Sequence, residues 1–308
     1  MTRTRLRLVA LMSLAAGCVS SPSPDAGVRL PDTEALEVER EQEAPARVLN
    51  DLDRLLAAYT QLRLNTGANR ADERRMRVEE ALRAAATEHF GQLVHDAVDS
   101  PYPRNRAIAL AALGFVDVAR RDQALDPLVN GLAAEDEAVV NNAILGLAVL
   151  QHEDTPVSPL VDILRSEERE LETRANAAWA LHEIQQVLVD PRRVVRVWLE
   201  LLDGPLQEES PLLSMTAIRG LGATRDPAHY EAVVPYVSHP VARVRWATAI
   251  ALGRMADERA VESLLTLLGP AEANDNVKLA ARKALQALAG GADRGYDVEA
   301  WRKVFERS

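Results

Sequence analysis

The stretch Val244–Leu268, VRWATAIALGRMADERAVESLLTLL, decides the fold of this chain. In its first half, small and apolar residues recur at i, i+4, i+7, i+8 and i+11, which places them on one face of a helix ending near Ala256. Asp257 marks a turn, and a second amphipathic helix follows through Val261 to Leu268. The stretch is therefore one repeat unit of two helices. The residues on the first helix face are Val244, Thr248, Ala251, Leu252 and Met255.

This unit recurs along the chain when the sequence is aligned on Gly253. A leucine directly precedes each aligned position, and an alanine or a threonine stands five residues before it. Small residues at that place allow a neighbouring helix to approach closely, so the recurrence predicts a stack of helix pairs. We expect an all-α fold, an α-solenoid in one elongated domain. The six aligned positions are Gly114, Ala148, His182, Gly222, Gly253 and Gln286.

The repeat also resembles a known family. Val244-Arg245, Ala251-Leu252-Gly253 and Asp257 are similar to the HEAT-like repeat named after phycobilisome lyases, and the resemblance covers roughly Arg104 to Leu288. It implies an ARM-type fold with a right-handed superhelix. It also implies a structural ladder between basic residues near the start of one helix and acidic residues in the turns. The ladder would consist of Arg106, Arg174, Arg245, Asp226 and Asp257.

The chain in order suggests five segments. Its first helical stripes, before the repeats, are typical of a degenerate end unit, which a solenoid needs because one face has no neighbour. At the other end we expect Trp301 to pack on the last repeat. The segments are a lipoprotein signal peptide at 1–17, a disordered tether at 18–32, N-terminal helices and a degenerate capping repeat at 33–103, six HEAT-like repeats at 104–289, and a C-terminal capping helix at 290–308.

The start of the chain has the pattern of an export signal. Three arginines precede an apolar centre of about 10 residues, too short to span a bilayer of ~30 Å. The sequence Leu14-Ala15-Ala16-Gly17-Cys18 resembles a bacterial lipobox, which implies cleavage before Cys18 and its modification with lipid, including palmitate. Val19, where an Asp would favour inner-membrane retention, implies the periplasmic side of the outer membrane. An ordinary signal peptide with an incidental cysteine is the alternative.

Charge excludes some functions. The net charge is −10, and without the leader the chain carries 33 basic against 46 acidic residues. This excess of acid disfavours non-specific binding to nucleic acid or to an anionic membrane surface.

The histidines are candidate metal ligands. Deoxyhypusine hydroxylases have similar repeats and bind iron through His-Glu pairs, and this chain contains His152-Glu153 and His182-Glu183. Neither pair stands in the register of those enzymes, and the six histidines show no metal-ligand spacing. We therefore expect no metal, no cofactor and no catalytic residue.

What remains is a surface. If the aligned helices line the inner curve, three positions in each repeat face that curve. The resulting row is unusually apolar for a solvent face, and it includes Trp, Met and Arg, residue types enriched at interfaces. The alternative is that neighbouring repeats cover these side chains and the tryptophans only pack laterally. The predicted partner-binding residues of the concave face are Trp179, Met215, Arg219, Trp246, Ile250 and Arg254.

These features predict a non-catalytic, lipid-anchored scaffold in the bacterial cell envelope, a monomer that binds an unknown protein partner through its concave surface. Two alternatives stay open. One is an enzyme or an enzyme's accessory subunit of the phycobilisome-lyase or deoxyhypusine-hydroxylase type, and the other is a purely structural envelope component.

Overall fold

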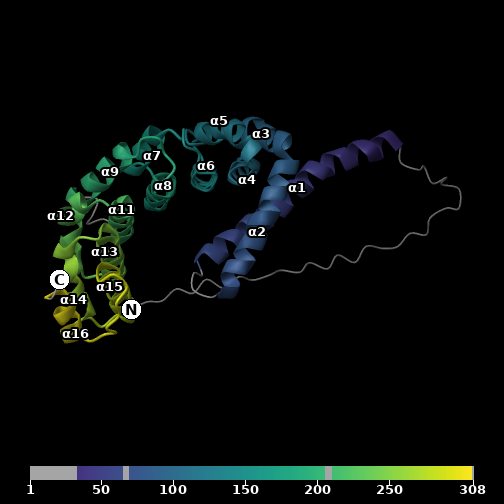
Figure 1. Ribbon diagram of the computed structural model, residues 1–308. Coiled ribbons are helices and arrows are strands. Elements are labelled where there is room, and N and C mark those ends of the chain that lie inside the picture. The colour runs from purple at the N-terminus through teal and green to yellow at the C-terminus, as the bar shows by residue number, and fades with distance from the viewer. Residues whose placement is uncertain (1–32, 65–68, 205–209, 307–308) are drawn as a thin grey trace, which may run out of the picture. The chain divides into compact units, whose positions relative to one another are not determined.

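The computed structural model describes residues 33–64, 69–204 and 210–306, and these residues are helical and contain no strand (Figure 1). The chain divides into two compact units, residues 1–43 and residues 44–308. Cys18, the predicted leader and the tether lie outside the described residues. None of the described helices is long and apolar enough to cross a membrane.

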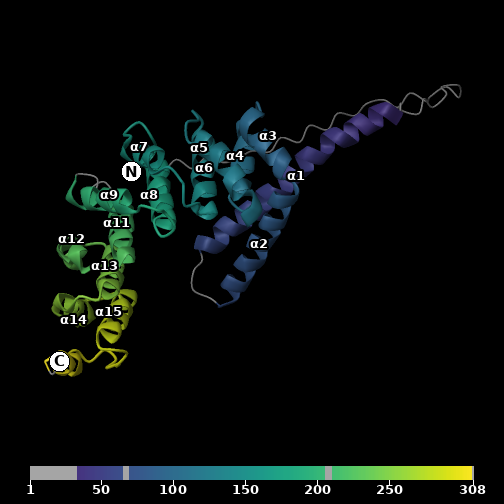
Figure 2. The same ribbon diagram turned by 45° about the horizontal axis from the view of Figure 1, so that its top comes forward.

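Residues 44–308 contain two rows of helices, which confirms the α-solenoid. Each inner helix contacts the next one along the chain. Figure 1 and Figure 2 show the outer helices as a second row beside them. The inner helices are α4 (Pro103–Leu113), α6 (Glu137–Leu150), α8 (Leu171–Ile184), α11 (Pro211–Thr224), α13 (Ala242–Met255) and α15 (Asp275–Leu288). The outer helices are α5 (Arg121–Gly131), α7 (Val157–Arg165), α9 (Arg192–Asp203), α12 (Tyr230–Val233), α14 (Val261–Leu268) and α16 (Val298–Phe305).

The recurring leucines and small residues form the core between the rows. All six leucines that precede the aligned positions are fully buried. The six small residues that stand five positions before the aligned positions are fully buried as well. Close packing depends on the small residues, because a Cβ added to Gly253 would lie 2.6 Å from the Cβ of Ala284 on the next inner helix. The buried leucines are Leu113, Leu147, Leu181, Leu221, Leu252 and Leu285, and the small residues are Ala109, Ala143, Ala177, Ala217, Thr248 and Ala281.

The turns after three inner helices use left-handed residues. Gln151, Arg225 and Ala256 end α6, α11 and α13 with φ values of 49°, 57° and 53°. After two of these turns an aspartate caps a short 3-10 helix: the side chain of Asp226 accepts a hydrogen bond from the backbone N–H of Ala228, and that of Asp257 accepts one from Arg259. The predicted turn acids therefore act as caps.

The expected Arg–Asp ladder differs from the pairing observed. Asp257 pairs with Arg259, two residues further on, and Arg245 pairs with Glu272 at 2.7 Å. Arg174 donates from Nε to the carbonyl of Leu164, at the end of α7. The physical reason is distance, because the arginines stand near the first turn of an inner helix and the aspartates just beyond its last turn, about 15 Å away at 1.5 Å per residue.

Arg106 and Asp226 also lie outside such a ladder. The Nε of Arg106 is buried without a hydrogen-bond partner in the described structure, and Asp226 serves its own turn. The ladder as a set of mutual pairs was therefore a wrong interpretation of five residues that recur in register.

Three helices precede the first repeat: α1 (Thr33–Leu64), α2 (Asn69–Glu88) and α3 (Phe90–Asp99). From Ala44 onwards α1 belongs to the same unit as the repeats. Its apolar stripe, with Leu52 and Tyr59, is buried in the common core, and Asp53 pairs with Arg104 of α4 at 2.6 Å. The helix α2 contacts α3 and α4.

The opposite end is closed by α16, which contacts α14. Trp301 is fully buried there, and its indole N–H donates to the carbonyl of Gly295 at 2.9 Å. This confirms the expected packing of Trp301 against the end of the array.

Candidate functional site

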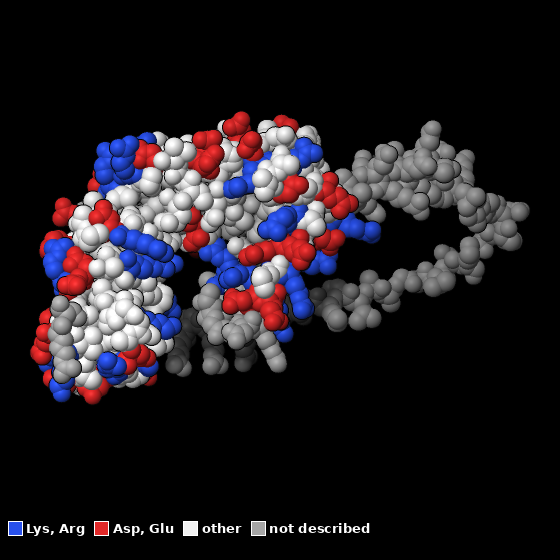
Figure 3. Space-filling model, viewed as in Figure 1, with Lys and Arg blue, Asp and Glu red and all other residues white. Residues whose placement is uncertain are grey.

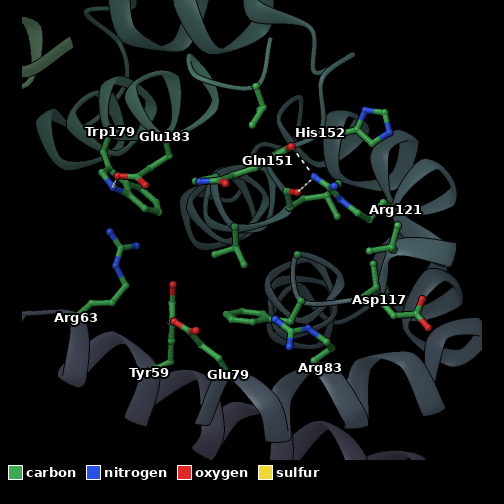
Figure 4. A pocket seen from close by; sticks show the side chains of 18 of the residues that line it. Tyr59, Arg63, Glu79, Arg83, Asp117, Arg121, Gln151, His152, Trp179 and Glu183 are labelled. Atoms are coloured by element: carbon green, nitrogen blue, oxygen red, sulfur yellow. Dashed lines mark hydrogen bonds between the residues drawn. The ribbon is translucent and has the colours of Figure 1, made fainter. Parts of the chain in front are cut away.

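A cavity of about 1520 Å³ lies between the α1–α2 pair and the inner helices. We call it the groove. Tyr59 and Arg63 of α1 and Glu79 and Arg83 of α2 form one wall, and the C-terminal ends of α4, α6 and α8 form the other (Figure 4). Residues of α11 and α13 extend the second wall. The groove thus combines residues of α1 and α2, which precede the repeats, with residues of five repeats.

Three of the six predicted concave residues line this groove. Trp179, Arg219 and Trp246 come from three successive inner helices, α8, α11 and α13. All three are half-buried, and the two tryptophans also pack against the hydrophobic core. These side chains are therefore partly covered by neighbouring repeats and partly open to a partner. The structure thus lies between the two alternatives that the sequence left open.

The other three predicted residues continue the same helix faces without lining the groove. Met215 and Ile250 are half-buried against the core, and Arg254 is exposed. Arg254 nevertheless acts on the groove electrostatically, because it lowers the pKa values of Arg219 and His182.

Trp179 is held by two contacts from opposite sides of the site. Its indole N–H donates to Oε1 of Glu183, one turn further along α8, at 3.0 Å. The guanidinium carbon of Arg63 lies 4.0 Å from the ring centroid, within the range of a cation–π interaction. Figure 4 shows Arg63 reaching from α1 toward Trp179. The indole is therefore fixed between a carboxylate and a guanidinium.

The α1 wall is anchored by aromatic packing. The ring of Tyr59 meets the ring of Phe115 edge to face, with centroids 4.9 Å apart and an interplanar angle of 89°. Burial raises the pKa of the Tyr59 hydroxyl, and the Arg63 guanidinium opposes that shift. Phe115 follows α4, so this contact joins the α1 wall directly to the first repeat.

The other end of the groove is built from helix termini. Arg121 donates from Nη2 to the carbonyls of Leu150 and Gln151, where it satisfies the C-terminal end of α6. His152 is buried, its Nε2 lies 2.9 Å from Oδ1 of Asp122, and its Nδ1 accepts from the N–H of Asp154. Both ring nitrogens of His152 therefore serve the turn.

His182 differs from His152. Its Nδ1 is buried without a hydrogen-bond partner in the described structure. Burial, together with the Arg219 and Arg254 guanidiniums, lowers the pKa of His182 to about 4. The ring is therefore neutral at physiological pH. Within the described residues, no group of three or more His, Cys, Asp or Glu side chains is placed to hold a metal ion.

Arg219 lies in the same electrostatic environment. Burial lowers the pKa of its guanidinium, Glu183 raises it, and Arg254 and Arg63 lower it. The guanidiniums of Arg63 and Arg254 thus both act on Arg219 at the α8–α13 end of the groove. The sequence pattern singled out Arg219 and Arg254 but missed Arg63, since Arg63 belongs to a helix outside the repeats.

The comparisons agree with this architecture. The HEAT repeat family matches residues 195–286, so the chain contains HEAT repeats. A comparison with curated proteins finds no match. The described residues thus form an α-solenoid that contains HEAT repeats, an architecture suited to protein–protein interaction because stacked repeats present an extended concave surface.

Several solved structures show similarity to this chain, and they include a designed repeat protein. The structure of YibA from Escherichia coli is 14% identical, with a TM-score of 0.54, and the match covers 87% of this chain and 97% of that one. A designed armadillo repeat protein is 21% identical over 64% of this chain and 98% of that one, with a TM-score of 0.46. Human deoxyhypusine hydroxylase in complex with glycerol is 17% identical over 85% of this chain and 98% of that one, with a TM-score of 0.29. YibA supports the fold alone, and the other two support no conclusion about this chain.

Proposed function

We propose that this chain is a non-catalytic, lipid-anchored scaffold of the bacterial cell envelope that acts as a monomer and holds a partner protein in the groove. One observation carries the proposal: Trp179 and Trp246, on separate repeats, are both half-exposed in one walled cavity. Aromatic side chains in partly enclosed sites are the usual anchors of protein interfaces, each contributing ~2 kcal/mol or more when it is a hot spot.

The walls support a binding role for these residues. A flat solenoid face offers a partner one surface, whereas the groove offers contacts from α1, α2 and the inner helices together. A bound segment would lose more exposed surface per residue in such a site, and the removal of apolar surface from water favours binding. The contact between Arg63 and Trp179 also limits the motion of the indole before a partner arrives.

The proposal is tested by the double variant Trp179→Ala/Trp246→Ala in cells that express the full chain. After chemical crosslinking, wild type should co-purify with one specific partner and the double variant should lose it. Tyr102→Ala is the control, because Tyr102 is an aromatic residue that is 65% exposed outside the groove. Retention of the partner by the double variant would show that the groove is not the interface. Turnover of a substrate by the purified chain would contradict a non-catalytic role.

The lipid anchor rests on the resemblance around Cys18. We expect the mature chain to begin at Cys18 and to partition into detergent, because two or more acyl chains hold a protein stably at a bilayer and one does not. Cys18→Ser should leave an unprocessed or soluble exported chain. A mature chain that begins upstream of Cys18 and carries a free thiol would refute the anchor. Fractionation of the envelope would test the outer-membrane location separately.

A further inference from the structure

At one end of the groove lies a cluster of arginines that form no ion pair within the described structure. The cluster consists of Arg63 and Arg219, which line the groove, and Arg254, which follows Trp246 by about two turns on α13. Figure 3 shows basic side chains gathered on the inner side of the bend, over α11 and α13. Arg63 connects the cluster to the Trp179 anchor, because its guanidinium stacks on that indole.

Some arginines elsewhere in the described structure bind carboxylates through two nitrogens. Arg245 binds Glu272 in this way, at 2.7 and 2.8 Å, and Arg282 binds Asp293 in the same forked manner. Within the described structure, neither Arg219 nor Arg254 makes a hydrogen bond or an ion pair. Arg219 therefore lines the groove half-buried, with its guanidinium unpaired within the described residues.

The nearby acidic side chains do not neutralise the cluster. Glu183 acts on Arg219, but its Oε1 accepts the indole N–H of Trp179. Glu79 of α2 lies 3.5 Å from Arg75. Three guanidiniums at this end thus face one carboxylate that is not already in an ion pair.

The pKa values of two side chains reflect the positive charge of these arginines. The pKa of His182 falls to about 4, with Arg219 and Arg254 adding to the effect of burial, and Arg63 and Arg254 lower the pKa of Arg219. Placing a further cation there would add to this repulsion. A carboxylate would relieve it, and an arginine that is partly desolvated pairs strongly with a carboxylate.

Three of the acidic side chains that line the groove lie at its other end. Asp117, Asp122 and Glu153 line the part next to the turns after α4 and α6. Figure 4 shows Asp117 and His152 on the side of the cavity opposite Arg63 and Trp179. At the end with the arginine cluster, the lining carboxylates are Glu183, which binds the Trp179 indole, and Glu79, which lies beside Arg75.

We infer that the α8–α13 end of the groove binds an acidic peptide segment of the partner protein, with apolar side chains on Trp179 and Trp246 and carboxylates on Arg63, Arg219 and Arg254. This inference rests on the proposed function and names the chemistry of the partner. Arginine suits the role because its stem packs on an aromatic ring while its guanidinium binds a carboxylate.

The test uses the detergent-solubilised full chain and a random peptide library displayed on phage. Peptides are selected on wild type and then measured on Arg219→Glu/Arg254→Glu. The control is Arg193→Glu/Arg196→Glu, which changes the charge by the same amount at two exposed arginines of α9 outside the groove. Selected peptides should be enriched in Asp and Glu beside apolar residues. The groove variant should bind them at least about tenfold more weakly, and the α9 control should bind them like wild type.

The remaining outcomes separate a failure of this inference from a failure of the proposed function. Selected peptides that lose binding in Trp179→Ala/Trp246→Ala but show no acidic excess would refute this inference and leave the groove as the interface. Acidic peptides that bind the groove variant as well as wild type would refute the role of Arg219 and Arg254. Peptides that bind independently of both the tryptophans and the arginines would refute the inference and the proposed function together.

Discussion

The close approach of the inner helices can be tested with a single methyl group. A Cβ added to Gly253 would lie 2.6 Å from the Cβ of Ala284 and 2.8 Å from its Cα, which is shorter than any ordinary contact. The Cα is backbone, so α13 and α15 must move apart to admit Gly253→Ala. Overpacking of this kind costs ~1–3 kcal/mol, against a gain of up to ~1 kcal/mol in helix propensity.

Gly91→Ala is the matched control for this change. Gly91 also lies in a helix, α3, but an added Cβ there meets nothing within 4 Å. It should therefore show only the propensity gain and stabilise the chain slightly. The difference between the two variants largely removes the propensity contribution and leaves the packing cost of ~1–3 kcal/mol.

Thermal unfolding followed by circular dichroism measures both variants. With ~2–4 °C for each kcal/mol in a chain of this size, Gly253→Ala should melt several degrees below Gly91→Ala. Equal stabilisation by the two substitutions would show that α13 and α15 do not pack at the distance described, and the account of the inner row would fail.

Two further predictions concern the core and one buried ion pair. Leu252→Ala should destabilise the chain by ~2–5 kcal/mol because Leu252 is fully buried, whereas Trp246→Ala, at a half-exposed residue, should cost much less; equal losses in urea unfolding would show that the helix faces are assigned wrongly. Glu272→Gln should destabilise the chain near pH 7 because it removes the charge that pairs with Arg245. The hydrogen bond from Arg245 holds the pKa of Glu272 below its usual value, so its contribution is present above pH ~4.3 and lost as pH falls through the lower folded value. Wild type should therefore lose more stability than Glu272→Gln between pH 7 and pH 3, and parallel loss in the two chains would refute the pairing.

The repeat architecture was predictable because its cause is local and repeated. One leucine and one small residue recur in each unit, and both are buried in every unit. A helix pair that cannot bury its apolar face alone must stack on its neighbours. The six repeat units, each with a weak pattern of its own, therefore together predict a solenoid. The Arg–Asp ladder shows the limit of such matching. The recurrence identified basic and acidic residues at equivalent positions of the repeats. The arginines, however, stand at the start of each inner helix and the aspartates beyond its end, so they do not pair.

Only the wall of the groove formed by the inner helices was predictable from the sequence. Trp179, Arg219 and Trp246 follow from the periodicity of the repeat, which tells which face of a helix they occupy. Tyr59 and Arg63 belong to α1, whose apolar stripe predicts a helix but does not specify the surface on which it packs. The contact between Arg63 and Trp179 joins residues more than a hundred positions apart, and no pattern in a single sequence encodes that pairing.

Photocrosslinking from inside the groove tests most directly whether a partner protein binds there. A photoreactive amino acid at Val187, which lines the groove, is compared in intact cells with the same amino acid at Leu171, an exposed residue at the other end of α8. The account predicts one specific protein adduct from position 187, lost in the Trp179→Ala/Trp246→Ala background, and none from position 171. An adduct from position 171 alone, or one from position 187 that persists without the two tryptophans, would contradict the groove as the partner site.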